Sequence, residues 1–139
     1  MVWSPDSYFN GGRPVLRAGT IAGTTDPGLY LGERFGNFSY AIPVSSGKYT
    51  VRLYFSDGYW GAEPSSSPGE GKRVFDVYCN GATLLRDFDV LKEAGGARRG
   101  LVETFHGLEP NGAGQLVFTF VPRENYAEVN AIEVLDESR

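Results

Sequence analysis

The chain has 139 residues, a length typical of one domain, and it combines 19 Gly and 8 Pro with 41% hydrophobic and 14% aromatic residues. This composition excludes a helical bundle, a disordered linker and a membrane span, and it favours short strands joined by tight turns. A net charge of −4 with scattered Lys and Arg disfavours nucleic-acid binding, and one Cys with one His cannot form a disulfide or a zinc cluster.

The first thirty residues are rich in turns, because Pro and Gly recur too often for a helix to persist. We expect loops there, with room for one short strand. The clearest strand is predicted at Tyr49–Phe55. In it Val51, Leu53 and Phe55 alternate with Thr, Arg and Tyr, which is the pattern of a strand with one buried face.

A second strand is predicted at Val74–Cys79, and it ends in Asn80-Gly81. This dipeptide is typical of a two-residue hairpin turn because both central positions need positive φ. The remaining elements are expected to be a return strand with Leu84 and Leu85, one helical turn at Val90–Ala94, and strands at Leu101–Phe105, Gln115–Val121 and Val129–Leu135. Short strands at this spacing indicate an all-β fold, an antiparallel β-sandwich or jelly roll with at most one short helical turn.

The sequence contains little that could catalyse a reaction. Asp87 and Asp89 are the one close acidic pair, and turn or capping chemistry explains them better than catalysis does. His106 is expected at a surface or a strand edge. Nucleophile-elbow, phosphate-loop and dinucleotide motifs do not occur in the sequence. We therefore expect no enzyme and no cofactor; Asp side chains and backbone carbonyls could hold a structural calcium ion, but no spacing demands one.

Aromatic residues in the Gly-rich segments favour a carbohydrate-binding surface instead. Sugars present flat C–H faces beside hydroxyls, so aromatic rings and a few polar side chains together bind them. The long connection 58–71 joins two predicted strands and carries Tyr59-Trp60, for which we favour binding over a core role. For Phe9 and Phe35 the two roles are evenly balanced. The loop aromatics considered are Tyr8, Phe9, Phe35, Tyr59, Trp60 and Tyr126.

Several motifs, in this order and over about residues 8–135, resemble malectin-type carbohydrate-binding domains. These motifs are Tyr30-x-x-Glu33-Arg34-Phe35-Gly36, Phe38-x-Tyr40-x-Ile42-Pro43, Tyr49–Phe55, Tyr59-Trp60, Arg73-Val74-Phe75-Asp76-Val77-x-x-Asn80-Gly81, Asp87-Phe88-Asp89-Val90 with Ala94-Gly95-Gly96, and Asn130-Ala131-Ile132-Glu133-Val134. The resemblance implies a galactose-binding-like jelly roll that binds glycans without catalysis. In the family, lumenal malectin recognises a diglucosylated glycan end, and similar domains are attached to bacterial glycoside hydrolases and plant receptor kinases.

The resemblance also implies a ligand site in loops at one end, where aromatics and an acidic side chain hold the glycan. The family's aromatic positions fall on Phe35, on Tyr59 and Trp60, and on either Tyr8 or Phe9. Its acidic position falls on Asn125, with Glu124 adjacent. Where the family has Tyr this chain has Phe35, and where it has a carboxylate this chain has an amide. These two departures predict a changed sugar specificity.

We therefore expect residues 1–139 to form one carbohydrate-binding module that binds an oligo- or polysaccharide, glucose-containing ones included. We expect it to come from a longer extracellular or periplasmic protein with a linked glycoside hydrolase. No apolar signal core follows Met1, so any export signal is expected outside this sequence. The alternative, motivated by Phe35 and Asn125, is a protein-interaction or spacer domain that keeps the sandwich without a working sugar site.

Overall fold

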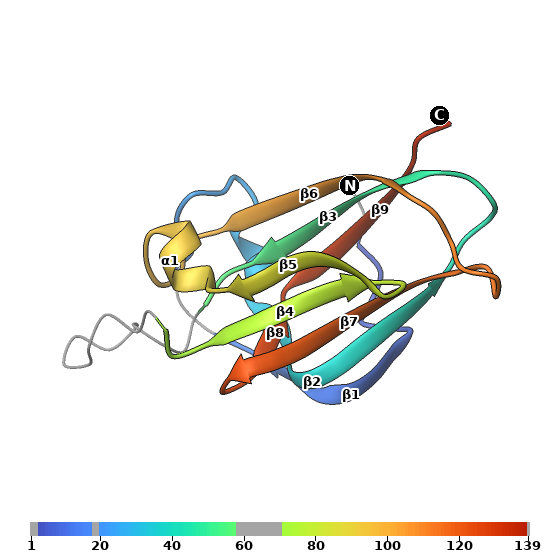
Figure 1. Ribbon diagram of the computed structural model, residues 1–139. Helices are drawn as coiled ribbons and strands as arrows, with labels where there is room; N and C mark the ends of the chain where they lie inside the picture. Colours follow the sequence, from blue (N-terminus) through green and yellow to red (C-terminus); the bar gives the residue numbers. More distant parts are fainter. Residues whose placement is uncertain (1–2, 18–19, 58–70, 139) are drawn as a thin grey trace.

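The computed structural model describes residues 3–17, 20–57 and 71–138, and within them two antiparallel sheets pack face to face (Figure 1). The large sheet contains, in spatial order, β1 (Phe9–Leu16), β2 (Gly32–Pro43), β7 (Gln115–Glu124), β4 (Val74–Cys79) and β5 (Ala82–Phe88), with β8 (Ala127–Val129) paired to β2. The small sheet contains β6 (Leu101–Leu108), β3 (Tyr49–Phe55) and β9 (Ala131–Asp136). The predicted fold class, an all-β antiparallel sandwich of jelly-roll type, is confirmed.

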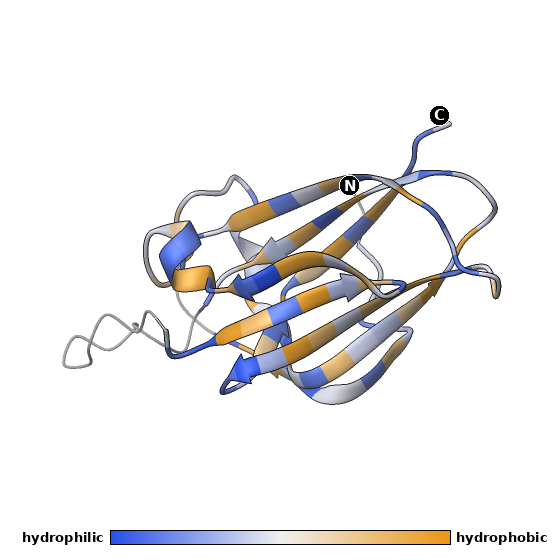
Figure 2. Cartoon of the chain, in the orientation of Figure 1, coloured by the Kyte–Doolittle hydropathy of each residue, from blue (hydrophilic) through white to orange (hydrophobic). Residues whose placement is uncertain are grey.

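The core lies between the two sheets and follows from the alternation of side chains along the strands. Figure 2 shows hydrophobic and hydrophilic bands alternating along the ribbon arrows. The predicted inward residues of β3 are fully buried, and so is the apolar face of β7. The fully buried residues of these two strands are Val51, Leu53, Phe55, Leu116, Phe118 and Phe120. Because these side chains come from both sheets, their burial holds the layers together.

The predicted hairpin and helical turn are both present. Asn80 and Gly81 adopt positive φ of 49° and 85° between β4 and β5. The helix α1 spans Val90–Ala94, where the backbone N–H of Lys92 donates to the Asp89 carboxylate at its N-terminus. Asp89 therefore has the capping role that its sequence context predicts. A 3-10 turn at Pro27–Tyr30, η1, was not among the predicted elements.

The sequence pattern did not predict β2 as a strand, although it is the longest one described. Gly36, Asn37 and Pro43 interrupt its apolar alternation, so period-2 reasoning finds no continuous face. The strand forms because both of its edges are paired. It pairs with β1 on one edge, and with β7 and β8 on the other. Hydrogen bonding to neighbouring strands thus overrides a weak local pattern.

The predicted final strand Val129–Leu135 is divided at Asn130 into β8 and β9, which belong to different sheets. The Asn130 amide donates to the carbonyls of Tyr30 and Gly32, and its Oδ1 accepts from the backbone N–H of Ser56. The Asn130 side chain thereby connects the junction of β8 and β9 to the start of β2 and the end of β3. These strand ends meet at one end of the sandwich, called here the loop end.

Candidate functional site

The loop end brings together the terminus of β3, the start of β4, the end of β7, β8 and the start of β2. Tyr59 and Trp60, the residues favoured most strongly by the sequence, lie outside the described residues. The described residues on either side of them, Asp57 after β3 and Gly71 before β4, both belong to the loop end. In Figure 1 these two strands approach this end beside α1.

Phe35 and Tyr126 form an aromatic pair at the loop end. Their ring centroids are 5.9 Å apart with a tilted, edge-on geometry, and Tyr126 is 55% exposed. Phe35 lies on β2 and pairs in register with Glu128 of β8, whereas Tyr126 lies in the turn between β7 and β8. The pair therefore offers a partly exposed apolar surface of the kind that binds a sugar face.

Asn125 and Glu124 lie beside this pair, at the end of β7. Asn125 adopts a positive φ of 57°, and its amide donates to the backbone carbonyl of Lys72. Its side chain thus ties the β7–β8 turn to the start of β4, which is a structural role. Glu124 is exposed and lies opposite Val74 in the register of β4 and β7. Of these two predicted polar residues, Glu124 presents the exposed carboxylate.

Tyr8 and Phe9 lie away from the aromatic pair. Phe9 pairs in register with Tyr40, five residues along β2 from Phe35, or about 16 Å at the usual rise per residue. The Arg34 guanidinium lies 3.6 Å from the centroid of the Phe9 ring, and Tyr40 contacts that ring edge-on. Tyr8 is 60% exposed. The structure therefore brings Phe35, Glu124 and Asn125 together at the loop end and separates Tyr8 and Phe9 from them.

A cluster of buried charges underlies the loop end, and we call Glu33, Asp57, Arg73 and Glu128 the buried charge cluster. All four side chains are nearly inaccessible to solvent. Arg73 Nη1 lies 3.3 Å from Glu33 Oε2, and Arg73 Nε lies 3.7 Å from Asp57 Oδ2. Glu33 also accepts a hydrogen bond of 2.6 Å from Arg17. Sequence reasoning missed this cluster, although two of its members, Glu33 and Arg73, belong to the motifs named above.

Glu128 is the most unusual member of the buried charge cluster, because no described residue gives either carboxylate oxygen a hydrogen bond. Burial raises the pKa of Glu128 well above its ordinary value, and the negative charges of Glu33 and Asp57 raise it further. Burial among like charges therefore favours the neutral form of Glu128, beside the ion pairs of Glu33 with Arg17 and Arg73 and of Arg73 with Asp57.

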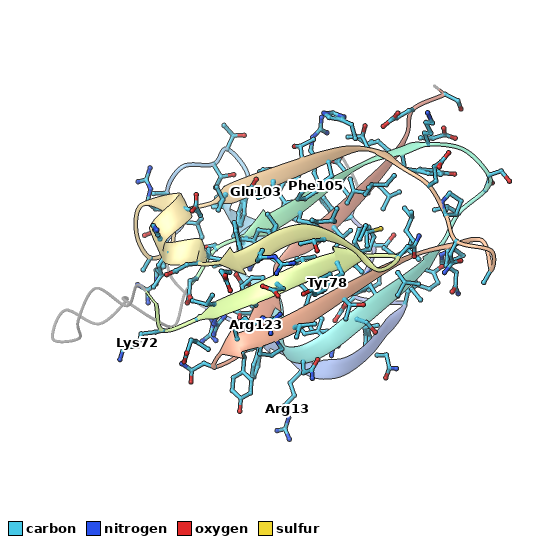
Figure 3. The ribbon with its side chains drawn as sticks, in the orientation of Figure 1. Arg13, Lys72, Tyr78, Glu103, Phe105 and Arg123 are labelled. Atoms are coloured by element: carbon cyan, nitrogen blue, oxygen red, sulfur yellow. The ribbon has the colours of Figure 1, made fainter. Side chains whose placement is uncertain are left out.

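A second polar network lies on the large sheet near the same end. Arg123 of β7 donates from Nε and Nη2 to the buried Asp76 carboxylate of β4, and the Tyr78 hydroxyl donates to it as well. Figure 3 shows Arg123 and Tyr78 on the same side of the sheet. Hydrogen bonding from Arg123 lowers the pKa of Asp76 to about 2. Asp87 donates its backbone N–H to Asp76, so Asp87 too belongs to a structural network.

Side chains of the types that bind metal ions are scattered over the described residues. Within residues 3–17, 20–57 and 71–138, no group of three His, Cys, Asp or Glu side chains could hold a metal ion. His106 lies exposed on β6, with Nδ1 3.0 Å from the Thr50 hydroxyl. No helix in the described part of the chain is long and apolar enough to cross a membrane.

Comparison with known proteins gives a family match and a set of plant relatives. A family model described as malectin domain matches residues 2–109. A probable LRR receptor-like serine/threonine-protein kinase of Arabidopsis thaliana is 28% identical over 75% of this chain and 10% of its own length. Receptor-like protein 4 of the same plant is 31% identical over 72% of this chain and 15% of its own length. The chain thus spans about a tenth of the curated relatives it matches.

Solved structures with a similar fold come from plants and bacteria. The FER structure, solved with the plant peptide RALF23 and LLG2, is 20% identical with a TM-score of 0.77, over 93% of this chain and 40% of that one. The ANX2 ectodomain of Arabidopsis thaliana is 15% identical with a TM-score of 0.75, over 93% and 41%. A β-glucuronidase of Bacteroides uniformis is 19% identical with a TM-score of 0.74, over 96% and 15%. At these identities the likeness shows the fold alone.

Proposed function

The chain belongs to the malectin domain family, and from that premise we propose that it is a non-catalytic domain that binds carbohydrate at the loop end. In general terms the proposal is a binding or extracellular interaction domain, which agrees with relatives that are receptor kinases and with structural neighbours described as ectodomains. The more specific part of the proposal, that the ligand is an oligo- or polysaccharide, rests on the side chains at the loop end.

One observation supports this proposal more than any other: the partly exposed pair of Phe35 and Tyr126 lies beside Glu124, where the segment containing Tyr59 and Trp60 joins the sandwich. An exposed aromatic ring can lie against the C–H face of a sugar, and a carboxylate accepts hydrogen bonds from adjacent hydroxyls. In this proposal Tyr59, Trp60 and Phe35 stack on the glycan.

Glu124 provides the charged acceptor in this proposal because its carboxylate is exposed at the end of β7, whereas the Asn125 amide N–H donates to the carbonyl of Lys72 and holds the turn. Asn125 then acts chiefly by holding the turn that positions Tyr126. Tyr8 and Phe9 are left out of the loop-end site, since register places Phe9 about 16 Å along β2 from Phe35. The buried charge cluster would fix the strand ends that carry the binding residues.

The protein in which this domain functions is a further part of the proposal. We expected a linked glycoside hydrolase, and the curated relatives give that expectation no support, because they are receptor-like kinases and a receptor-like protein. The likeness to a β-glucuronidase concerns the fold. We propose that residues 1–139 form one domain of a longer extracellular protein whose other parts resemble those of receptors more closely than those of hydrolases.

The test of the loop-end site is the replacement Trp60→Ala. Binding of an oligosaccharide identified on a glycan array should weaken at least about tenfold from an initial affinity between micromolar and millimolar, since a few stacked contacts supply most of it. Calorimetry gives the affinity, and thermal unfolding should be nearly unchanged. Phe9→Ala provides an aromatic control, because Phe9 is 45% exposed and register places it about 16 Å along β2 from Phe35. Unchanged binding by Trp60→Ala would refute the assignment.

A second candidate function is a protein-interaction domain without a working sugar site. Two observations favour it: Phe35 lacks the phenol hydroxyl of the family, and the Asn125 amide is engaged by Lys72. A structural neighbour was solved with a plant peptide, and that partnership is a property of the neighbour. A panel of gluco-, galacto- and xylo-oligosaccharides that produces neither chemical-shift changes nor thermal stabilisation would support this second function over the first.

A further inference from the structure

A cavity of about 630 Å³ lies on the small sheet, on the side that faces away from the core, and we call it the outer cavity. Tyr54 and Val102 are cross-strand partners on β3 and β6, and both alternate with core residues. Three aromatic and three polar side chains line much of this cavity: Trp3, Tyr30, Tyr54, Thr24, Thr25 and Asp26. Its volume lies within the range of ligand pockets, about 300–1,000 Å³.

The aromatic rings of the outer cavity are grouped around Tyr54. The Trp3 ring lies edge-on to Tyr54 with centroids 5.5 Å apart, and the Tyr30 ring lies 6.1 Å from it. The Tyr54 hydroxyl donates to Glu133 at 2.9 Å, and Glu133 also accepts from Arg52. Because its hydroxyl is fixed in this way, the Tyr54 ring is held in one orientation before any ligand arrives.

The polar side of the outer cavity is formed by the segment before η1. Figure 1 shows this part of the chain, coloured blue to cyan after β1, beside the small sheet. The backbone N–H of Asp26 donates to the Thr24 hydroxyl at 3.0 Å, whereas the Asp26 carboxylate makes no capping bond to the turn that follows. Burial raises the pKa of the Tyr30 phenol, and the Asp26 charge contributes to that rise. Asp26 therefore lies close to the aromatic group while remaining exposed.

We propose that the outer cavity is a second carbohydrate-binding site for a neutral sugar unit, on the outer face of the small sheet rather than at the Phe35 and Tyr126 pair. The C–H face of the sugar would lie against Trp3 and Tyr54, and its hydroxyls would donate to the Asp26 carboxylate and exchange hydrogen bonds with Thr25. The charged group lining this cavity is a carboxylate, so uronic acids and sulfated sugars would be repelled.

The surroundings of the outer cavity favour an oligosaccharide over a single sugar. Trp3 and Leu29 also line a neighbouring cavity of about 700 Å³, which lies between residues 3–8, β2 and β9. The two cavities therefore adjoin at Trp3. A chain of two or more sugar units could occupy both, with Trp3 between them.

The experiment is an NMR titration of ¹⁵N-labelled protein with maltotriose, cellotriose, xylotriose and galactotriose in turn. The expected result is that at least one neutral trisaccharide, at millimolar concentration, gives saturable shifts of the Trp3 indole N–H and the Thr24 and Thr25 amides. Trp3→Ala and Asp26→Ala should each weaken the affinity, measured from the Thr24 and Thr25 amide shifts, about tenfold. Glu109→Ala, which removes an exposed carboxylate elsewhere, should not.

The titration separates this site from the loop end. Trp60→Ala should leave the shifts around Trp3 and Thr25 unchanged, while Trp3→Ala should leave any shifts around Phe35 and Tyr126 unchanged. If the loop end binds no sugar, the resonances of Trp3, Thr24 and Thr25 still report whether the outer cavity does. The proposal is overturned if none of the four trisaccharides shifts the Trp3 indole, or if Asp26→Ala binds as well as the unmodified protein.

Discussion

At the residue scale, the most consequential single side chain is Glu128, a carboxyl group buried completely among other charges. Its pKa is raised well above the ordinary glutamate value of 4.5, so the folded protein holds a proton that the unfolded chain releases. The free energy of unfolding must then fall as pH rises above that ordinary value. The buried charge cluster is therefore a pH-dependent element of stability beneath the loop end.

Glu128→Gln tests this account. The amide cannot ionise, so above about pH 4.5 the decline of unfolding free energy with rising pH should become shallower by up to about 1.4 kcal/mol per pH unit. Urea unfolding at several pH values measures that slope. Glu124→Gln is the matched control, because Glu124 is exposed at the same end of the sandwich. Parallel curves for Glu128→Gln and the unmodified protein would contradict a protonated Glu128.

Asp76 has the opposite pH dependence. Arg123 lowers the pKa of Asp76 to about 2, so its stabilising contribution is present above the ordinary value of 3.8 and is lost as pH falls toward 2. Asp76→Asn should cost about 1–3 kcal/mol at neutral pH, because Arg123, Tyr78 and the Asp87 N–H lose a charged acceptor.

The measurement for Asp76→Asn is urea unfolding at neutral and at acid pH. The difference from the unmodified protein should shrink as the Asp76 carboxyl becomes protonated. Tyr78→Phe, which removes one of the same hydrogen bonds and keeps the ring, should have a smaller effect at both pH values. A difference that stays constant down to about pH 2 would show that ionisation of Asp76 does not stabilise the fold.

At the scale of elements, β1 and β2 fit together through glycines. Gly12 has a φ of +70°, and a Cβ added there would lie 2.8 Å from the carbonyl oxygen of Phe35. The register of β1 and β2 shifts between Gly11 and Arg13, so Gly12 lies at an irregularity in the pairing. The position of Phe35 in the loop-end site thus depends on a close backbone contact that only Gly permits.

Gly12→Ala should therefore destabilise the domain by about 1–3 kcal/mol, through both the positive φ and the steric contact. Gly28→Ala is the matched control, because no atom lies within 4 Å of a Cβ added at Gly28 and its φ is ordinary. Urea unfolding of the two variants compares them directly. Equal stabilities would mean that β1 can shift without cost and that the contact with Phe35 is dispensable.

At the scale of the whole molecule, the two sheets are completed by the last third of the chain. The family match ends at residue 109, yet β7 lies between β2 and β4 in the large sheet, and β9 pairs with β3 in the small one. The buried side chains Leu116, Phe118 and Phe120 belong to β7. The cooperative unit therefore has to include residues beyond the matched segment.

A truncated chain of residues 1–109 should fail to fold. It lacks the central strand of the large sheet and the two fully buried rings of Phe118 and Phe120, each worth about 3–5 kcal/mol in a core. Near-ultraviolet circular dichroism and urea unfolding would show the loss of fixed packing, with residues 1–139 as the control. A cooperative transition in the truncated chain would refute this account of the folding unit.

Much of the architecture could be predicted from the sequence. The elements that were not predicted, β2 above all, were missed for physical reasons. The alternation of Val51, Leu53 and Phe55 and the Asn80-Gly81 turn identified elements that depend on neighbouring residues alone. The strand β2 escaped prediction because its pairing on both edges, rather than its own pattern, makes it a strand. Of the residues predicted for the site, Phe35, Glu124 and Asn125 belong to strands and a turn at the loop end, while Phe9 lies farther along the sheet, and their role in binding stays a prediction.

The sequence by itself determined the all-β class, the main core strands and the richness in loop aromatics, because composition and period-2 alternation are local properties. Only the tertiary structure decided which charges share a buried space and which rings form a cavity. Glu33, Asp57, Arg73 and Glu128 come from four separate segments, and so do the residues of the outer cavity. Ion pairing, burial and cavity shape depend on distances between segments remote in sequence, and the fold alone sets those distances.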